Sequence, residues 1–157
     1  MALETSGHIS VAVDRSTAFA IVRDPVRLAR CIPGCTELRE TAPNRYTAVL
    51  TSRVAFMTLS FNVIVDVTKI EPPAALEAKV TGDARGLSGH VVATARLDLA
   101  DTGDSTTTVR YVTAVGLTGK LGSLGQPVLR ATSAKLAREF GDNLKMEIEK
   151  GSAGSTG

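Results

Sequence analysis

Residues 75–99 read ALEAKVTGDARGLSGHVVATARLDL, two runs in which apolar and polar side chains alternate. A period of two places successive side chains on opposite faces of a β-strand, so each run predicts a strand with one apolar face. The two apolar faces consist of Leu76, Ala78, Val80, Gly82 and Ala84, and of Val91, Ala93, Ala95, Leu97 and Leu99. The turn between the runs is short and rich in glycine, which favours an antiparallel hairpin with one side facing a core.

The same pattern continues on both sides of this hairpin. Residues 46–54, 59–70 and 106–117 are further predicted strands, separated by turns that contain Pro, Asn, Asp or Gly, and residues 9–13 form a first strand. Their inward side chains are expected to include Leu59, Phe61, Val63, Val65 and Val67, then Val109, Tyr111, Thr113 and Val115. Links this short predict an antiparallel meander over residues 36–118.

Helical patterns flank the strands. Residues 14–22 predict a short helix with Ser16 as its N-cap, and residues 26–31 predict a second one, which ends at Pro33. The segment Ser123-Leu-Gly-Gln126 resembles a capping box, after which apolar residues recur at helical spacing as far as Ile148. A long helix is therefore expected to run to Lys150, with residues 151–157 (GSAGSTG) as a disordered tail.

These elements predict one α+β domain over residues 1–150. A curved antiparallel sheet of about seven strands wraps around the long C-terminal helix, and two short helices follow the first strand. Aromatic residues make up only 4% of the chain and Trp is absent. Small core residues fill little volume, so this composition either reflects an Ala-rich coding bias or leaves an apolar tunnel between helix and sheet. A tunnel would be a ligand-binding architecture.

Composition and motifs exclude several classes of function. A balance of 18 basic and 16 acidic residues argues against a nucleic-acid binder. The N-terminus lacks the features of a secretory signal and no apolar run is long enough to cross a bilayer, so we expect a cytoplasmic protein. Cys31 and Cys35 are separated by three residues, so they do not form a C-x-x-C pair. His8 and His90 lie far apart in the sequence, so they do not form the second pair of ligands that a zinc site usually has. We expect reduced, partly buried thiols and no metal site.

Three segments resemble one known family. Residues 23–35 (RDPVRLARCIPGC), residues 109–111 (VRY) and residues 119–125 (GKLGSLG) are similar in order and spacing to the carbon monoxide dehydrogenase CoxG family, within the START-like, or SRPBCC helix-grip, superfamily. The resemblance spans residues 7–145. The chain departs from the family at Phe19, where a Trp is common. Many members carry a longer C-terminal extension, whereas this sequence ends shortly after the expected last helix, so it is either a short form or a trimmed chain.

The resemblance implies a function outside catalysis. It implies an accessory protein of a molybdenum hydroxylase of the carbon monoxide dehydrogenase type, linked to recruitment of the enzyme to the membrane. Together with the apolar tunnel inferred above, this predicts a protein that holds a lipophilic ligand and couples the enzyme to the membrane. We expect the ligand to be a non-covalently bound quinone, such as menaquinone or ubiquinone, and the protein to be peripheral at the inner face of the cell membrane. A docking protein without a ligand and a small helix-grip enzyme are the alternatives. The predicted inner faces carry no His, Asp, Glu or Lys, which favours binding over catalysis.

The candidate site residues come from the predicted inner strand faces, the two short helices and the turn after them, the hairpin tip and the start of the last helix. Ligand contacts are expected from Phe19, Leu28, Ile32, Phe56, Leu59, Phe61, Val63, Ala78, Val80, Ala93, Ala95, Val109, Tyr111, Thr113, Leu121, Leu124 and Val128. Membrane contacts are expected from Phe56, Met57 and Leu117, although the tip formed by Phe56 and Met57 would equally suit a lid over the tunnel.

Some roles stay open at the level of sequence. The Tyr111 hydroxyl needs a partner, either within the protein or on a ligand carbonyl, and Ser52 and Thr113 are weaker candidates of the same kind. The glycines of residues 116–125 suit either a gate or a close backbone approach. Residues 31–35 form either the turn that closes one end of the sheet or a lid over the pocket.

Overall fold

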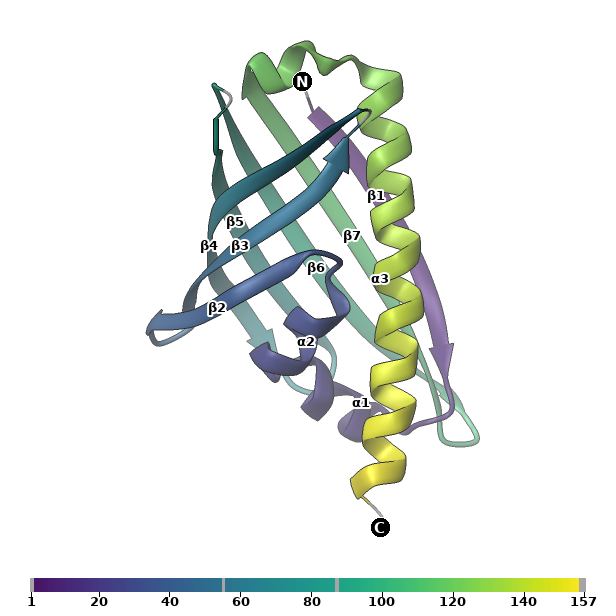
Figure 1. The fold of residues 1–157 in the computed structure, drawn as a ribbon. Coiled ribbons are helices and arrows are strands. Elements are labelled where there is room, and N and C mark those ends of the chain that lie inside the picture. The colour runs from purple at the N-terminus through teal and green to yellow at the C-terminus, as the bar shows by residue number, and fades with distance from the viewer. Residues whose placement is uncertain (1, 55, 87, 156–157) are drawn as a thin grey trace.

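The computed structural model describes residues 2–54, 56–86 and 88–155. The chain forms one seven-stranded antiparallel sheet with the strand order β1-β7-β6-β5-β4-β3-β2. The sheet curves around the long helix α3, and the two short helices lie at one end (Figure 1). The elements are β1 (Ala2–Val11), α1 (Arg15–Val22), α2 (Pro25–Cys31), β2 (Cys35–Ala42), β3 (Arg45–Val54), β4 (Met57–Glu71), β5 (Ala75–Ala84), β6 (Gly89–Gly103), β7 (Thr106–Gly119), the 3₁₀ helix η1 (Lys120–Leu124) and α3 (Gln126–Ser155).

The strand register confirms the predicted faces. Leu76 lies opposite Leu97, and further along the same two strands Ala78 lies opposite Ala95 and Val80 opposite Ala93. On the next strand Thr113 lies opposite Ala95. Because side chains alternate along each strand, these residues share the inner face of the sheet. The predicted α+β class, with a curved sheet, a long C-terminal helix and two short helices after the first strand, is confirmed.

The N-cap of the first helix lies two residues earlier than predicted. Asp14, not Ser16, is the N-cap of α1: its carboxylate accepts a hydrogen bond from the Thr17 N–H at 3.1 Å and another from the Thr17 hydroxyl at 2.6 Å. Asp14 has the extended backbone that a cap needs, whereas Ser16 already lies inside the helix. Asp24 caps α2 in the same way.

The last helix begins within the predicted segment, at Gln126, but without the predicted cap, and it ends later than predicted. The Ser123 hydroxyl donates to the Lys120 carbonyl at 2.6 Å within η1, so it does not form the predicted capping box with Gln126. At its other end α3 continues past Lys150, where the sequence predicted its end, to Ser155. Gly151 packs closely on α1 and α2, where a Cβ would lie 3.0 Å from Ile21 Cδ1 and 2.9 Å from Arg27 Nη1. Residues 156 and 157 lie outside the described residues.

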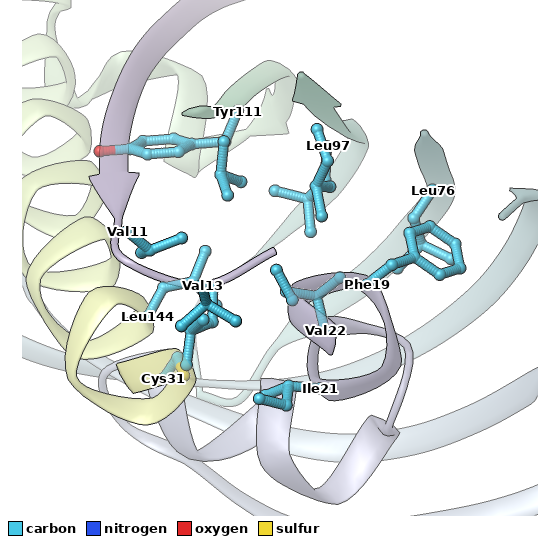
Figure 2. Close-up of a cluster of buried hydrophobic side chains, with 14 residues drawn as sticks. Val11, Val13, Phe19, Ile21, Val22, Cys31, Leu76, Leu97, Tyr111 and Leu144 are labelled. Atoms are coloured by element: carbon cyan, nitrogen blue, oxygen red, sulfur yellow. The ribbon is translucent and has the colours of Figure 1, made fainter. Parts of the chain in front are cut away.

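The buried core consists of two separate clusters. The α1–α2 cluster joins both short helices to the second half of α3 and the nearby ends of β1, β5, β6 and β7; ten of its residues are labelled in Figure 2. The hairpin cluster lies on β3 and β4 and comprises Ala48, Val54, Leu59, Phe61 and Val63. Hydrogen bonds attach α3 near the first cluster, from Asn143 Nδ2 to the Cys31 carbonyl at 3.1 Å and from the Ala12 N–H to Glu149 at 3.2 Å.

Candidate ligand-binding site

A stretch of the inner sheet face belongs to neither core cluster. We call it the central patch: it consists of Ala78, Ala93, Ala95, Thr113 and Val115, on β5, β6 and β7. All five side chains remain partly exposed although they lie on the inner face. Along β6 the patch lies between Val91, which packs on the hairpin cluster, and Leu97, which is buried in the α1–α2 cluster.

The side of α3 that faces the sheet also has a stretch that belongs to neither core cluster. Val128 packs on the hairpin cluster and Phe140 packs on the α1–α2 cluster. Thr132 and Leu136 follow Val128 at intervals of four residues, so they lie on the same side of the helix. Both are partly exposed and belong to neither cluster. Small side chains on the sheet therefore lie at the level of a stretch of α3 that is likewise not packed into a core cluster.

The backbone contacts of α3 agree with this arrangement. Helix α3 approaches β1 extensively and also contacts α1, α2 and β3. Within the described residues, α3 has no comparably extensive approach to β5 or β6, the strands that supply most of the central patch. Helix α3 is thus in contact with one edge and one end of the sheet. The central patch, in the middle of the sheet, consists of small side chains on strands that α3 approaches less closely.

Tyr111 is oriented away from the central patch. Its ring packs edge-on against Phe140, with centroids 5.4 Å apart and an interplanar angle of 85°. The hydroxyl points toward the side where β1 and α3 meet (Figure 2), and there it lies against Gly7 and Gly141. Burial, with a smaller contribution from Asp142, raises the pKa of Tyr111. The phenol therefore fills a space between strand and helix, which disfavours its predicted contact with a ligand carbonyl.

The other predicted ligand contacts fall into distinct groups. Ala78, Ala93, Ala95 and Thr113 form most of the central patch. Leu59, Phe61 and Val63 are buried in the hairpin cluster, with Val80, Leu124 and Val128 packed around it. Phe19 and Val109 are fully packed in the α1–α2 cluster, against which Leu28 also lies. These last three residues close one end of the fold and are removed from the patch.

Two predicted ligand contacts lie away from the central patch. Phe56 is 99% exposed at the tip between β3 and β4, and Ile32 is 37% exposed after α2. An exposed side chain at a hairpin tip does not line the inner face, because the tip extends beyond the last paired residues, Val54 and Met57. The side chain of Leu121 lies outside the described residues. Thr132 and Leu136 were not predicted, although their spacing from Val128 would have identified them.

An open pocket of about 300 Å³ lies elsewhere, between α1 and the β4–β5 turn. It is lined by Ser16, Phe19 and Ala20 of the helix, by the C-cap residue Arg23 and by Pro72 and Pro73 of the β4–β5 turn. Of the predicted ligand contacts it includes Phe19 alone. Its lining includes no residue of the central patch.

The two cysteine thiols are free. Cys31 is buried, and its Sγ donates to the Arg27 carbonyl at 3.4 Å. Burial raises the pKa of Cys31 to about 11 and also raises the pKa of the half-buried Cys35. Such thiols are poor nucleophiles and poor metal ligands. Across the described parts of the chain, His, Cys, Asp and Glu side chains form no group of three or more that would hold a metal ion.

The predicted membrane contacts lie at the end opposite α1 and α2. Met57 is 38% exposed beside Phe56, whereas Leu117 is half-buried against the hairpin cluster. Among the helices in the described ranges, none is both long and apolar enough to span a bilayer.

Solved structures with the same fold come from several bacteria. A conserved protein from Geobacillus kaustophilus is 28% identical, with a TM-score of 0.84 over 94% of this chain and 96% of that chain. The ZhuI aromatase/cyclase from Streptomyces sp. R1128 is 12% identical, with a TM-score of 0.73 over 100% and 99% of the two chains. A START superfamily protein from Mycobacterium smegmatis is 13% identical, with a TM-score of 0.69 over 94% and 97%.

The family assignment rests on the sequence as a whole. No curated protein matches this chain. The family model that describes the CoxG subunit of carbon monoxide dehydrogenase matches residues 7–149, which include all three segments that carry the resemblance. With a START-like fold and a match over most of its length, the chain belongs to the carbon monoxide dehydrogenase CoxG family.

Proposed function

We propose that this protein is a non-catalytic accessory protein of a molybdenum hydroxylase of the carbon monoxide dehydrogenase type. It binds a lipophilic ligand between α3 and the inner sheet face and couples the enzyme to the membrane. A quinone is the ligand class that fits this role, because electrons from a soluble hydroxylase must reach a lipid-soluble acceptor. Family membership supports the accessory role, and the fold supports a ligand between helix and sheet.

One observation carries the ligand proposal. The central patch remains partly exposed between two well-packed clusters, and Thr132 and Leu136 repeat this interruption on the facing helix. Apolar surface of this kind gains about 25 cal/mol per Å² when it is removed from water. The patch consists of alanine, valine and threonine and has no ionisable group, so it suits an uncharged apolar molecule.

The same composition argues against catalysis. A general acid or base must be within hydrogen-bond reach of its substrate, and the central patch offers only the Thr113 hydroxyl. The similarity to the Streptomyces aromatase/cyclase, at 12% identity, concerns the fold. The remaining alternative is a docking protein that recruits the hydroxylase without binding a ligand.

The first experiment is organic extraction of the purified protein followed by mass spectrometry for isoprenoid quinones and lipids. We expect a quinone in stoichiometric amount, or uptake of added quinone from detergent micelles. Extraction of a phospholipid or fatty acid would support the binding site but contradict a quinone as its ligand. No extracted molecule and no uptake from micelles would favour the docking protein.

Substitutions in the central patch locate the bound molecule. Ala93→Phe and Ala95→Phe place a large ring on the inner face and should abolish uptake from micelles. Thr94→Phe is the matched control, because Thr94 lies between them on the outer face of β6 and is exposed. Uptake that survives both inner substitutions would contradict this location.

A further inference from the structure

The end of the molecule that carries the β3–β4 hairpin combines an apolar tip with unpaired basic residues. Val54 and Leu59, at the base of the hairpin, share a cluster with Leu117, Leu124 and Val128. The end of β7, η1 and the start of α3 therefore adjoin the hairpin, as Figure 1 also shows. We call this region the hairpin end. The turn between β5 and β6 belongs to it, because the Arg85 N–H donates to the Ser60 carbonyl at 2.8 Å.

The apolar component of the hairpin end is concentrated at its tip. Phe56 is 99% exposed, and Met57 next to it is 38% exposed. Leaving a phenylalanine ring in water forgoes on the order of 2 kcal/mol or more that its burial would contribute. An isolated exposed side chain is ordinary, but an aromatic ring at the outermost point of a hairpin, beside a methionine, is suited to insertion into another phase.

Acidic residues are nearly absent from the hairpin end. Residues 41–65, 84–97 and 105–138 contain no Asp or Glu, and these ranges supply the hairpin, the β5–β6 turn, η1 and the first turns of α3. Of the 16 acidic residues, only Glu4 and Asp83 lie near this end. Although the total charge is near neutral, the acidic residues are therefore unevenly distributed, and almost all of them lie away from the hairpin end.

The basic residues of the hairpin end also lack counter-charges. Arg53, Lys120 and Arg130 are exposed and have no acidic partner within 4 Å in the part of the chain that the structure describes. Arg85 donates to the neutral Asn62 amide oxygen at 2.7 Å and keeps its charge uncompensated. Elsewhere several cations are paired, as Lys69 is with Glu71 at 2.8 Å.

From this juxtaposition we infer that the hairpin end docks on an anionic phospholipid bilayer, with the Phe56 ring inserted at the headgroup level and the surrounding Arg and Lys side chains on the lipid phosphates. This inference rests on the membrane coupling in the proposed function and adds its surface and its lipid class. An apolar side chain surrounded by cations is the combination that interfacial binding uses. Each Lys or Arg near an anionic surface strengthens binding about fivefold.

Vesicle flotation of the full chain tests the surface. The wild type should bind vesicles of equimolar phosphatidylcholine and phosphatidylglycerol, bind pure phosphatidylcholine far less, and dissociate as salt is added. Phe56→Ser should weaken binding on the order of tenfold. The double substitution Arg53→Gln/Lys120→Gln should weaken it about 25-fold, the product of two fivefold losses.

Matched controls lie at the other end of the molecule. Met146→Ser removes an exposed apolar side chain from the second half of α3, and Arg39→Gln/Lys145→Gln removes the same charge from exposed positions of β2 and α3. Both should bind vesicles like the wild type. Equal losses in test and control variants, or equal binding of the wild type to both vesicle types, would overturn the inference.

A second readout separates this inference from the proposed function. Quinone delivered in uncharged detergent micelles bypasses the bilayer, so the hairpin variants should take it up normally. Uptake from micelles without any vesicle binding would refute the membrane surface and leave the ligand role intact. A hydroxylase that binds the wild type but not the Arg53→Gln/Lys120→Gln variant in the absence of lipid would assign the same cations to a protein partner and also refute the membrane surface.

Discussion

The phenol oxygen of Tyr111 lies against the backbone of Gly141, in the space that the Cβ of any other residue would occupy. Tyr111 comes from β7 and Gly141 from the middle of α3, so the contact joins sheet and helix. Gly7 on β1 leaves space for the same oxygen on the other side, where a Cβ would lie 2.5 Å from it. One tyrosine thereby sets the distance between α3 and the sheet edge, next to the central patch.

Gly141→Ala should destabilise the protein. Alanine is favoured over glycine inside a helix by about 1 kcal/mol, so helix propensity alone predicts the opposite. The added methyl group would overlap the Tyr111 oxygen and lie 3.4 Å from Ile9 Cγ2, and such overpacking typically costs about 1–3 kcal/mol. Urea unfolding at neutral pH measures the difference.

Tyr111→Phe supplies the control for this clash. Removing the phenol oxygen should reduce the cost of Gly141→Ala, and a double-mutant cycle gives the coupling between the two positions. Equal costs in both backgrounds would mean that the methyl group is accommodated by movement of the helix instead.

The sheet was predictable because its pattern is local. In residues 75–99, alternation alone identifies the two faces, and the register of Ala78 with Ala95 follows from the short turn. The N-cap of α1 was assigned wrongly because Asp14 and Ser16 are both good caps and only the backbone decides between them. The end of α3 depends on a tertiary contact, the packing of Gly151 on Ile21, which no local pattern contains.

The candidate site was predictable in part for the same reason. Periodicity placed Ala93 and Ala95 on the inner face, but it did not distinguish positions in a packed cluster, such as Val109, from positions beside it. That distinction depends on where α1 and α2 cover the sheet. The roles of Gly7 and Gly141 likewise depend on the direction of the Tyr111 side chain in three dimensions.

The capping carboxylate of Asp14 should make stability depend on pH. Its hydrogen bonds from the side chain and the N–H of Thr17 lower the pKa of Asp14 below the ordinary value of 3.8. A lowered folded-state pKa means that the stabilisation is complete above about pH 4 and is lost as pH falls through the folded-state value. Asp14→Ala should therefore destabilise at pH 7, with a difference that shrinks in acid.

Asp14→Asn separates charge from capping, because asparagine also caps helices but does not titrate in this range. Urea midpoints measured from pH 7 down to about pH 2.5 for the wild type and both variants give the comparison. A gap between wild type and Asp14→Ala that stays constant in acid would contradict the assigned pKa shift.

Cys31 should be unreactive until the protein unfolds. With a pKa of about 11, only about one thousandth of the thiol is ionised at pH 8, and the side chain is buried besides. In a Cys35→Ser background, labelling by iodoacetamide should be slow in buffer and rapid in concentrated urea. Fast labelling of the native protein would place Cys31 in a segment that opens readily.

The central patch should tolerate a large side chain that a packed position does not. Ala18 is fully buried in the α1–α2 cluster, so Ala18→Phe should cost at least about 3 kcal/mol or prevent folding. Ala95 is the same residue on the partly exposed inner face, where the ring of Ala95→Phe would cover apolar surface without displacing a cluster.

We therefore expect Ala95→Phe to change the free energy of unfolding by less than about 1 kcal/mol. Urea unfolding of the two variants tests this with the same chemical change at two positions. A cost for Ala95→Phe comparable to that of Ala18→Phe would mean that α3 packs tightly on the patch. The ligand would then have no place there, because the space that admits a quinone ring is the same space that admits the phenyl group.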